Sequence, residues 1–271
     1  MSLKKTRKRF LFILFLTCLH FPTLGQGFSY GTSSEEALIA YHQGWQRILD
    51  LGEWTLAEES FRNAVENDPD FLLGWSQVGR ISNEPEERME IYQMLEEKKD
   101  EAEGFERELL EVYLGSLKII DYRDRGLGIK PEMVSEFRDK LFSTSQSFLQ
   151  IYPEEIYIEA EYMEAIHGIY GAKATLDSMA NRQIFDKSAF FKSYQALCFS
   201  ELCQSKEAML ALDELSELLG TEDSPAFYYT KGRILYDQEK YSEAKKSINK
   251  CLELDQKHTL ARRMETLLND Y

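Results

Sequence analysis

Cysteine is scarce in this sequence, and the few cysteines exclude one class of exported protein. Only four of the 271 residues are cysteine, and Cys18 lies in an apolar run near the start. The other three, Cys198, Cys203 and Cys251, are an odd number, whereas small secreted domains are held together by several paired cysteines. The chain is therefore not predicted to be a disulfide scaffold, and Cys198 and Cys251 are expected to act as small apolar filler.

Histidines and catalytic motifs are equally sparse. After residues 1–25 only His42, His167 and His258 remain, and none is paired at i, i+4 with a second metal ligand. His167 is expected in a turn between two helices, and His258 at the start of the last helix. Phosphate-binding loops, nucleophile elbows and acidic calcium loops do not occur. We therefore expect no catalytic residues, no cofactor and no metal site, and we predict that the chain is not an enzyme.

Positive charge is in short supply as well. The sequence has 32 Lys and Arg against 47 Asp and Glu, and five of the basic residues precede position 10. Without those five, the rest of the chain carries a net charge of −20. A surface of that sign repels phosphate backbones and anionic lipid, so nucleic acid and membrane surfaces are not predicted partners.

The start of the chain has the order of a secretory signal peptide. Five basic residues at 4–9 precede an apolar run at 10–19, and small residues stand before a cleavage site at Gln26. A membrane anchor needs about 20 apolar residues, which is roughly twice this run, and Thr17 before Cys18 differs from a bacterial lipobox. We expect residues 1–25 to be removed and the product to be exported to a bacterial periplasm or the extracellular space. No later apolar run is long enough for stable membrane insertion.

An internal repeat dominates the second half of the sequence, with a spacing of 36 residues. Small residues recur at one position, alanine at a second and larger apolar residues at three more. These sets are Ala160, Ala196 and Gly232; Ala172, Ala208 and Ala244; Met163, Phe199 and Leu235; Leu176, Leu212 and Ile248; Met179, Leu215 and Cys251. Small residues allow two helices to approach closely, while apolar residues four and seven positions later lie on one helical face. One helix pair cannot bury that face, so the pairs are expected to stack.

This pattern resembles the tetratricopeptide repeat family, and the best single match lies near the N-terminus. Gly52, Trp54, Ala57, Phe61 and Ala64, followed by Asp68–Pro69, agree with the family, although Trp45 stands where the family keeps a small residue. The resemblance implies an all-α fold, an α-solenoid of stacked antiparallel helix pairs in a right-handed superhelix. The matching residues cover 35–69 and 154–258. The predicted repeat domain spans 34–271, with about six pairs and a last helix at 257–269. Residues 26–33 are expected to be a flexible N-terminal segment.

The middle of the chain, about 83–153, departs from the repeat pattern. It predicts a long helix at 102–122, a loop at 123–131 with two glycines and a proline, and a second helix at 133–152. A degenerate tetratricopeptide pair and a non-repeat insertion both explain these residues.

The resemblance also implies a binding face, because the family turns certain positions of each first helix towards a concave groove. Counting from the aligned small residues gives nine candidates for this groove. They are His42, Gln46, Tyr157, Glu161, Phe190, Leu197, Tyr229, Arg233 and Tyr236. Tyr229, Arg233 and Tyr236 share one helical stripe and are expected to be largely exposed, whereas Phe190 and Leu197 fit either the groove or packing between helices. The lysines and asparagines of the family's carboxylate-clamp subclass are missing from these positions.

The leading functional hypothesis is therefore an exported protein–protein interaction module, a scaffold or assembly factor with a concave groove. Its partner is an unidentified protein or peptide. The alternative is an envelope accessory or sensor domain that binds a peptide or small ligand in the same groove.

Overall fold

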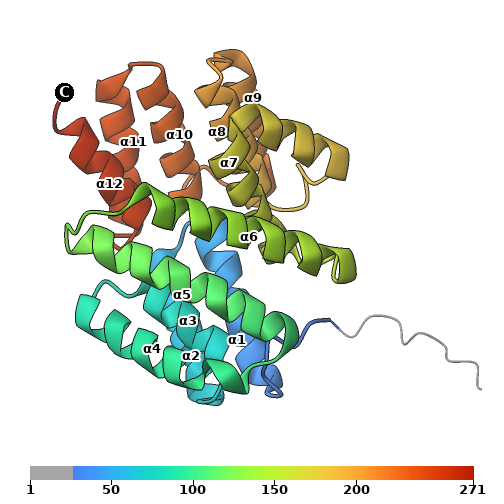
Figure 1. Ribbon diagram of the computed structural model, residues 1–271. Helices are drawn as coiled ribbons and strands as arrows, with labels where there is room; N and C mark the ends of the chain where they lie inside the picture. Colours follow the sequence, from blue (N-terminus) through green and yellow to red (C-terminus); the bar gives the residue numbers. More distant parts are fainter. Residues whose placement is uncertain (1–26) are drawn as a thin grey trace, which may run out of the picture.

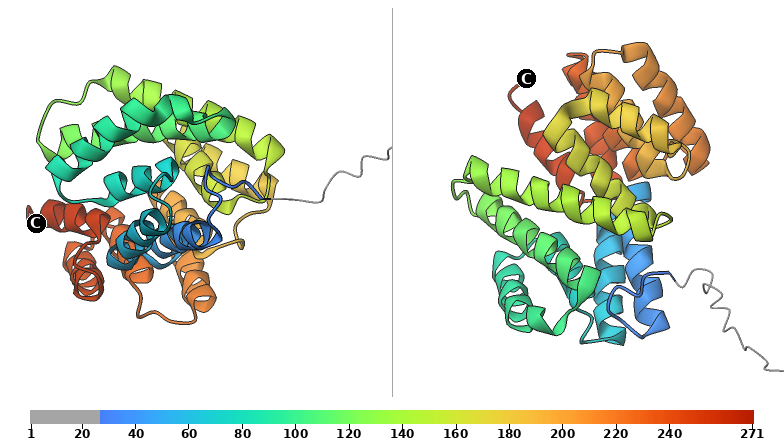
Figure 2. Two further views of the ribbon diagram at one scale, coloured as in Figure 1. Left: turned by 90° about the horizontal axis from the view of Figure 1, so that it is seen from below. Right: turned by 45° about the vertical axis from the view of Figure 1, so that its right-hand side comes forward.

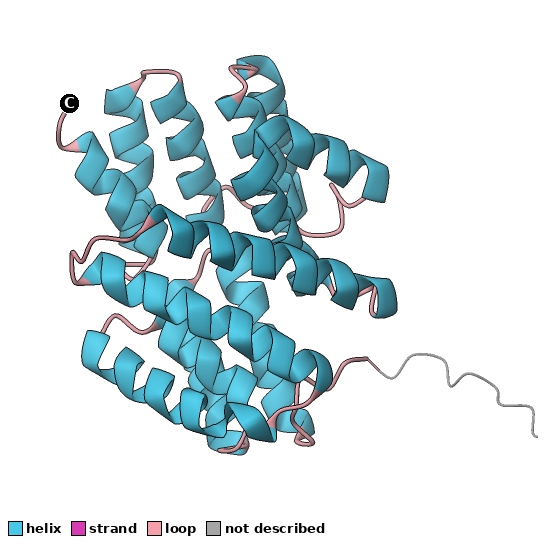
Figure 3. Cartoon of the chain, viewed as in Figure 1, coloured by secondary structure: helices cyan, strands magenta, loops and turns pink. Residues whose placement is uncertain are grey.

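The computed structural model describes residues 27–271, so the predicted signal peptide lies outside the described residues. Within this range every regular element is helical (Figures 1 and 3), which confirms the predicted all-α solenoid. The elements are α1 (Glu35–Gln46), the π-helical turn η1 (Arg47–Leu51), α2 (Trp54–Asn67), α3 (Leu72–Ile81), α4 (Pro85–Lys98), the 3₁₀ turn η2 (Lys99–Glu101), α5 (Gly104–Asp124), α6 (Pro131–Ile151), α7 (Ile156–Arg182), α8 (Ala189–Glu201), α9 (Ser205–Leu219), α10 (Pro225–Asp237), α11 (Tyr241–Leu254) and α12 (Thr259–Leu268). None of these helices is both long and apolar enough to cross a bilayer.

Helix boundaries follow from the local sequence. α4, α6 and α10 begin with proline, at the position where a helix needs no backbone N–H donor. η1 ends at Gly52 and α9 at Gly220, both with positive φ, which glycine adopts because it has no Cβ. His258 caps α12, since its side chain accepts a hydrogen bond from the N–H of Ala261, as the sequence predicted.

Consecutive helices pack as pairs: α1 with α2, α3 with α4, α5 with α6, α8 with α9, and α10 with α11. Short connections make neighbouring helices antiparallel (Figure 1). α7 supplies another unit by bending at Gly171, whose backbone angles are not helical. The helix runs through His167 before this bend, so the prediction that His167 lies in a turn is wrong; the small residue that breaks the helix is Gly171. α12 packs on α11 as the last helix.

Small residues set the approach of the paired helices, as the repeat pattern requires. A Cβ on Gly232 of α10 would lie 2.6 Å from the Ile248 side chain of α11, so a larger residue would force this side chain to move. Ala208 and Ala244, near the starts of α9 and α11, are completely buried. The 36-residue alignment is therefore in register over these two units.

The π-helical turn η1 shifts the register of the first unit. A π-turn contains one residue more than an α-turn. The extra residue lies in η1, between α1 and Gly52, where the first helix of the unit ends. As a result Gly44, and not Trp45, makes the close approach: a Cβ on Gly44 would lie 2.5 Å from the ring of Phe61. A shift of one residue rotates the helical position by about 100°. Trp45 therefore points towards the groove, in the direction that the family pattern assigned to Gln46.

The segment before α1 is packed, and the prediction of a flexible segment at 26–33 is wrong for its described residues, 27–33. Tyr30 is 1% exposed, and its hydroxyl donates a hydrogen bond to Glu155 at 2.8 Å. The ring of Phe28 lies edge-on to Phe148 with centroids 5.0 Å apart. Two aromatic side chains therefore fasten this segment to α6 and to the residues before α7.

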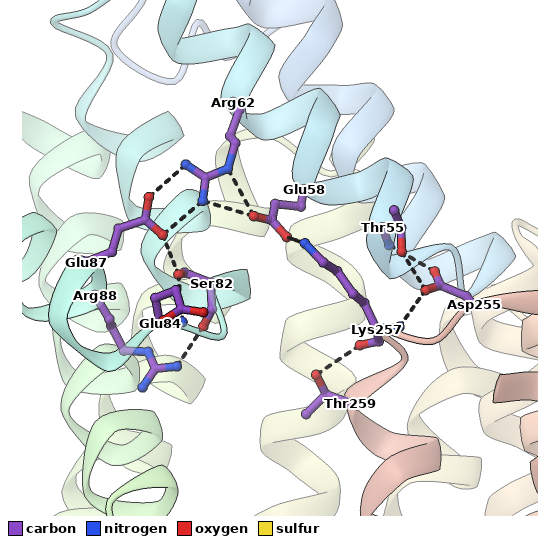
Figure 4. A network of polar contacts seen from close by, with 10 residues as sticks. All are labelled: Thr55, Glu58, Arg62, Ser82, Glu84, Glu87, Arg88, Asp255, Lys257 and Thr259. Atoms are coloured by element: carbon purple, nitrogen blue, oxygen red, sulfur yellow. Dashed lines mark hydrogen bonds and ion pairs between the residues drawn. The ribbon is translucent and has the colours of Figure 1, made fainter.

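The solenoid bends back on itself, so its first unit touches its last units (Figure 2). Asp50 in η1 accepts a hydrogen bond at 3.0 Å from the backbone N–H of Phe190 in α8. Thr55 and Glu58 of α2 bond to Asp255 and Lys257, in the turn before α12 (Figure 4). These contacts, which we call the closure contacts, join residues about 140 to 200 positions apart.

Candidate binding cavity

The closed arrangement of helices surrounds a central cavity of about 830 Å³. Its wall receives side chains from α1 to α8, α10 and α12, together with the turns next to α2 and α12. Residues near both ends of the described chain, such as Trp45 and Arg263, therefore line the same space. This half-open cavity lies on the inner side of the curved solenoid, where the repeat pattern predicts a concave groove.

Four of the nine predicted groove residues line the cavity: Glu161, Phe190, Leu197 and Tyr229. Phe190 is 8% exposed and stacks on Tyr194 with ring centroids 5.1 Å apart. Leu197 is half-buried. Both earlier readings of Phe190 thus hold at once, because it packs between helices and also forms part of the wall.

The other five predicted residues are not part of the cavity wall. His42 and Gln46 were counted without the extra residue of η1, and Trp45 occupies the wall instead. Tyr157 stacks on the outer side of Trp45, with ring centroids 6.2 Å apart. Arg233 and Tyr236 lie in the last turns of α10, away from its N-terminal end, which faces the cavity.

The expectation that Tyr229, Arg233 and Tyr236 are largely exposed is also wrong, since all three are half-buried. Tyr229 packs against the ring of His258 at 5.0 Å, and Tyr236 lies edge-on to Tyr241 at 5.5 Å. Arg233 pairs with Asp237 at 3.4 Å. The cause is the last helix, α12, and the C-terminal residues, which cover this face of α10.

Glu161 lies at the wall, but its carboxylate already has protein partners. Arg80 forms an ion pair with Oε1 at 3.0 Å, and the hydroxyl of Tyr113 donates to Oε2 at 2.7 Å. The Arg80 guanidinium also lies over the ring of Tyr113, 4.7 Å from its centroid. Buried charges are tolerated when they are paired and hydrogen-bonded in this way. Glu161 therefore holds α3, α5 and α7 together.

A second polar group crosses the wall from α7 to α8. The two ring nitrogens of His167 lie 2.9 Å from the Tyr194 hydroxyl and 2.9 Å from the Glu201 carboxylate. In neutral His167, Nε2 donates to Glu201 because a carboxylate only accepts, and Nδ1 then accepts from Tyr194. This arrangement orients the Tyr194 ring, which forms part of the wall.

Glu164 is the one wall carboxylate with a strongly altered acidity. Surrounding protein and the negative charge of Glu161 raise its pKa to about 7, while Arg80 acts in the opposite direction. The side chain is nevertheless exposed to solvent in the cavity, and water there screens part of this effect. No ion pair to Glu164 forms within residues 27–271, and no group of three His, Cys, Asp or Glu side chains in this range is placed to hold a metal ion.

Several wall residues were missed by the sequence reasoning. They are Trp45 and Trp54, the arginines Arg80, Arg88, Arg123, Arg138 and Arg263, and the aromatic Tyr194. Most come from second helices, from the irregular middle or from the last helix, whereas the family pattern assigns only first-helix positions to the groove. Tyr194 was missed because the groove positions of the family pattern on α8 include its neighbour Ser193 and not Tyr194 itself.

Comparison with known families agrees with this architecture. The tetratricopeptide repeat family matches residues 225–258, which contain α10, α11 and the turn that carries Asp255 and Lys257. No curated protein matches the sequence. The chain is an all-α helical solenoid of the tetratricopeptide type. It carries a tetratricopeptide repeat at its C-terminal end, and such a repeat indicates a protein–protein interaction module with protein partners.

Proposed function

We propose that this chain is an exported interaction module, a scaffold or assembly factor, that takes a short segment of a partner protein into its central cavity. The cavity volume of about 830 Å³ is the observation that carries this proposal. Pockets of roughly 300–1,000 Å³ hold small ligands or a few side chains. A folded domain does not fit, so the occupant is a peptide segment that enters through the opening of the ring.

The chemistry of the wall supports a peptide occupant. Trp45, Phe190, Tyr194 and Tyr229 present aromatic surface, and arginines stand beside them. Aromatic and arginine side chains dominate the energetics of protein interfaces, because they bury a large area at a low cost in conformational entropy. The negative charge of the rest of the surface favours a protein partner over nucleic acid.

Export is the second part of the proposal, and it rests on the sequence of residues 1–25 alone. The basic stretch, the short apolar run and the small residues before Gln26 have the order of a cleaved signal. We place the working protein in a bacterial periplasm or outside the cell.

A small ligand is the alternative occupant, and the cavity volume of about 830 Å³ favours it, because this volume lies in the range of small-ligand pockets. An accessory or sensor domain of this kind would hold its ligand tightly enough to survive purification. Mass spectrometry of the native protein under non-denaturing conditions distinguishes the two functions: a constant added mass of a small molecule indicates the sensor function, and its absence indicates the peptide.

Site-specific photo-crosslinking tests the proposed function. A benzophenone amino acid replaces Leu197, on the cavity wall, and in a control replaces Leu210, which is 59% exposed on α9. In cells that produce the full chain, the label at 197 should capture a discrete protein and the label at 210 should not. Capture at 210 alone, or no capture at 197, contradicts a cavity-bound partner.

A further inference from the structure

The cavity wall differs in charge from the rest of the molecule. Residues 27–271 contain 47 acidic and 27 basic residues, yet the wall has five arginines and only four acidic residues, Asp124, Glu161, Glu164 and Glu201. Glu161 pairs with Arg80 within the wall, and Glu201 bonds to His167. Four arginines then remain against Asp124 and Glu164. The wall therefore carries more positive charge than its own carboxylates neutralise.

Arg88 is the most buried of these arginines, with 1% of its surface exposed. Its Nη2 donates to the backbone oxygen of Ser82 at 2.7 Å and pairs with Asp124 at 2.8 Å. Its Nε and Nη1 have no hydrogen-bond partner within residues 27–271, and the closest carboxylate oxygen, on Asp121, is 3.9 Å from Nη1. A buried guanidinium with unused donors is costly unless another acceptor reaches it.

The carboxylates near Arg88 are shared with other arginines. Asp121 accepts from Nε of Arg125 at 2.8 Å, and Asp124 also pairs with Arg123 at 3.3 Å. Two aspartates at the end of α5 thus serve three guanidiniums, at the C-terminus of a helix. The local donors outnumber the acceptors.

Arg263 approaches the same region from the other end of the chain. It projects from α12, lines the cavity and forms no hydrogen bond or ion pair within residues 27–271. Burial lowers its pKa, and the positive charge of Arg123 lowers it further. Arg123 and Arg263, from helices far apart in the sequence, therefore line one cavity and repel each other. The charge of Asp124 only partly offsets this effect on Arg263.

We propose that Arg88, Arg123 and Arg263, which we call the arginine site, bind a carboxylate group of the ligand that occupies the cavity. This proposal rests on the proposed function and names the chemistry that the partner segment needs. A guanidinium presents two parallel N–H donors that match the two oxygens of a carboxylate. A carboxylate beside Arg123 and Arg263 would replace their repulsion by two attractive contacts. Its negative charge would also compensate that of Arg88, whose Nε and Nη1 are closed to solvent.

The group that supplies the carboxylate has two sources, an acidic residue of a peptide and a free organic acid. Both present the same two oxygens to the arginine site. The aromatic wall beside the site gives a peptide additional contacts that a small acid lacks. An octapeptide of alternating Glu and Tyr with blocked ends therefore serves as the first probe, and glutarate as the second.

Isothermal titration calorimetry with the purified mature protein measures both probes. The Glu–Tyr peptide should bind, with an affinity that salt weakens, and the same peptide with Gln in place of Glu should bind about tenfold more weakly or worse. Arg263→Gln should weaken the Glu–Tyr peptide by about tenfold. Arg262→Gln is the matched control, because Arg262 is the exposed neighbour on the same helix and loses the same charge.

The outcomes separate the arginine site from the cavity function. Binding of glutarate that competes with the peptide assigns the carboxylate to a free acid, and peptide binding alone assigns it to a protein segment; both support the site. Equal binding of the Glu and Gln peptides overturns the arginine site but leaves a peptide-binding cavity. Equal effects of Arg263→Gln and Arg262→Gln overturn it as well, and so does the absence of binding by both probes. Thermal melting accompanies each variant, and Arg263→Gln should melt no lower than the parent because it removes an unpaired charge.

Discussion

Thr55 and Asp255 lie 200 positions apart in the sequence and share two hydrogen bonds. The backbone N–H of Thr55 donates to one carboxylate oxygen of Asp255 at 2.9 Å, and its hydroxyl donates to the other at 2.7 Å. Lys257, two residues further on, pairs with Glu58 at 2.5 Å (Figure 4). The second helix of the first unit therefore holds the turn at the end of the matched tetratricopeptide repeat. This relationship joins the two ends of the solenoid beside the cavity, whose wall includes the neighbouring Trp54 and His258.

Gly52 should be the most sensitive glycine of the closure. It has φ of +70°, and a Cβ there would lie 2.7 Å from the backbone nitrogen of Ala226 at the start of α10. Gly220 has nearly the same φ but no neighbouring atom within 4 Å of a Cβ. Gly220→Ala should cost about 1 kcal/mol in the free energy of unfolding, from backbone strain alone. Gly52→Ala should cost about 1–3 kcal/mol more, because α10 must move.

Urea unfolding followed by circular dichroism measures both glycine variants. The difference between them isolates the contact with α10, since the strain at positive φ is common to both. An equal loss of stability in the two variants would show that the first unit does not press against α10 in solution.

Ala208 should tolerate no larger side chain. It is completely buried where α8 and α9 meet, so Ala208→Leu should overpack this contact and lower the free energy of unfolding by about 1–3 kcal/mol. Ala180→Leu is the matched control, since Ala180 is exposed on α7. It should change the free energy by less than about 0.5 kcal/mol. If thermal unfolding shows the same loss for both, the packing of this repeat differs from the structure.

His258 should make the protein less stable in mild acid. Burial lowers its pKa to about 4, although the charge of Asp255 partly opposes this shift. Because this folded-state pKa lies below the ordinary value of 6.5, the unfolded chain binds more protons between the two values. The contribution is complete above pH 6.5 and is lost as the pH falls towards 4. Between about pH 7.5 and 5 the loss from this group should be about 2 kcal/mol.

His258→Asn tests this pH dependence, because asparagine keeps a side-chain acceptor for the helix N-terminus and does not titrate. Urea unfolding at the two pH values should show a smaller decrease for the variant than for the parent protein. Comparison of the two proteins cancels other titrating groups, such as Glu164, whose raised pKa acts in the opposite direction. Identical pH dependences would mean that His258 is solvated in the folded protein.

Export predicts a specific N-terminus. The mature protein isolated from its natural cell should begin at Gln26 or within a few residues of it, because the small residues before Gln26 fit a signal-peptidase site. Intact-mass spectrometry and N-terminal peptide mapping give the answer. A product that retains Met1, or one that begins with a lipid-modified Cys18, would disagree with cleavage there.

The repeat pattern was sufficient to predict the helix pairs but not their closure. Gly232, Ala208 and Ala244 lie where the two helices of a unit meet. Such contacts join residues that are close in the sequence, so a repeat pattern reveals them. The closure depends on Thr55 and Asp255, whose residue types are ordinary for a helix start and for a turn. A repeat pattern describes only contacts between neighbouring helices and does not pair two residues that are 200 positions apart. The curvature of the solenoid could therefore not be predicted from the sequence.

The candidate site was half predicted for a related reason. In α7 and α8 the counted positions Glu161, Phe190 and Leu197 reach the cavity, because these helices follow the family register. In α1 the π-turn adds one residue and turns Trp45 inwards in place of Gln46. Its mark in the sequence is Trp45 at the position that the family keeps small, which does not by itself reveal a π-turn. The arginine site escaped notice because Arg88, Arg123 and Arg263 come from a second helix, the irregular middle and the last helix.

The distance between α2 and α12 tests the closed solenoid most directly. Spin labels at Glu59 and Arg262, both exposed, in a protein whose exposed Cys203 is replaced by serine, allow this distance to be measured by double electron–electron resonance. The closure contacts predict one short, narrow distance distribution, and Thr55→Val with Glu58→Gln should broaden it. A long or broad distribution in the otherwise unchanged protein would describe an open superhelix without a central cavity and would contradict the account.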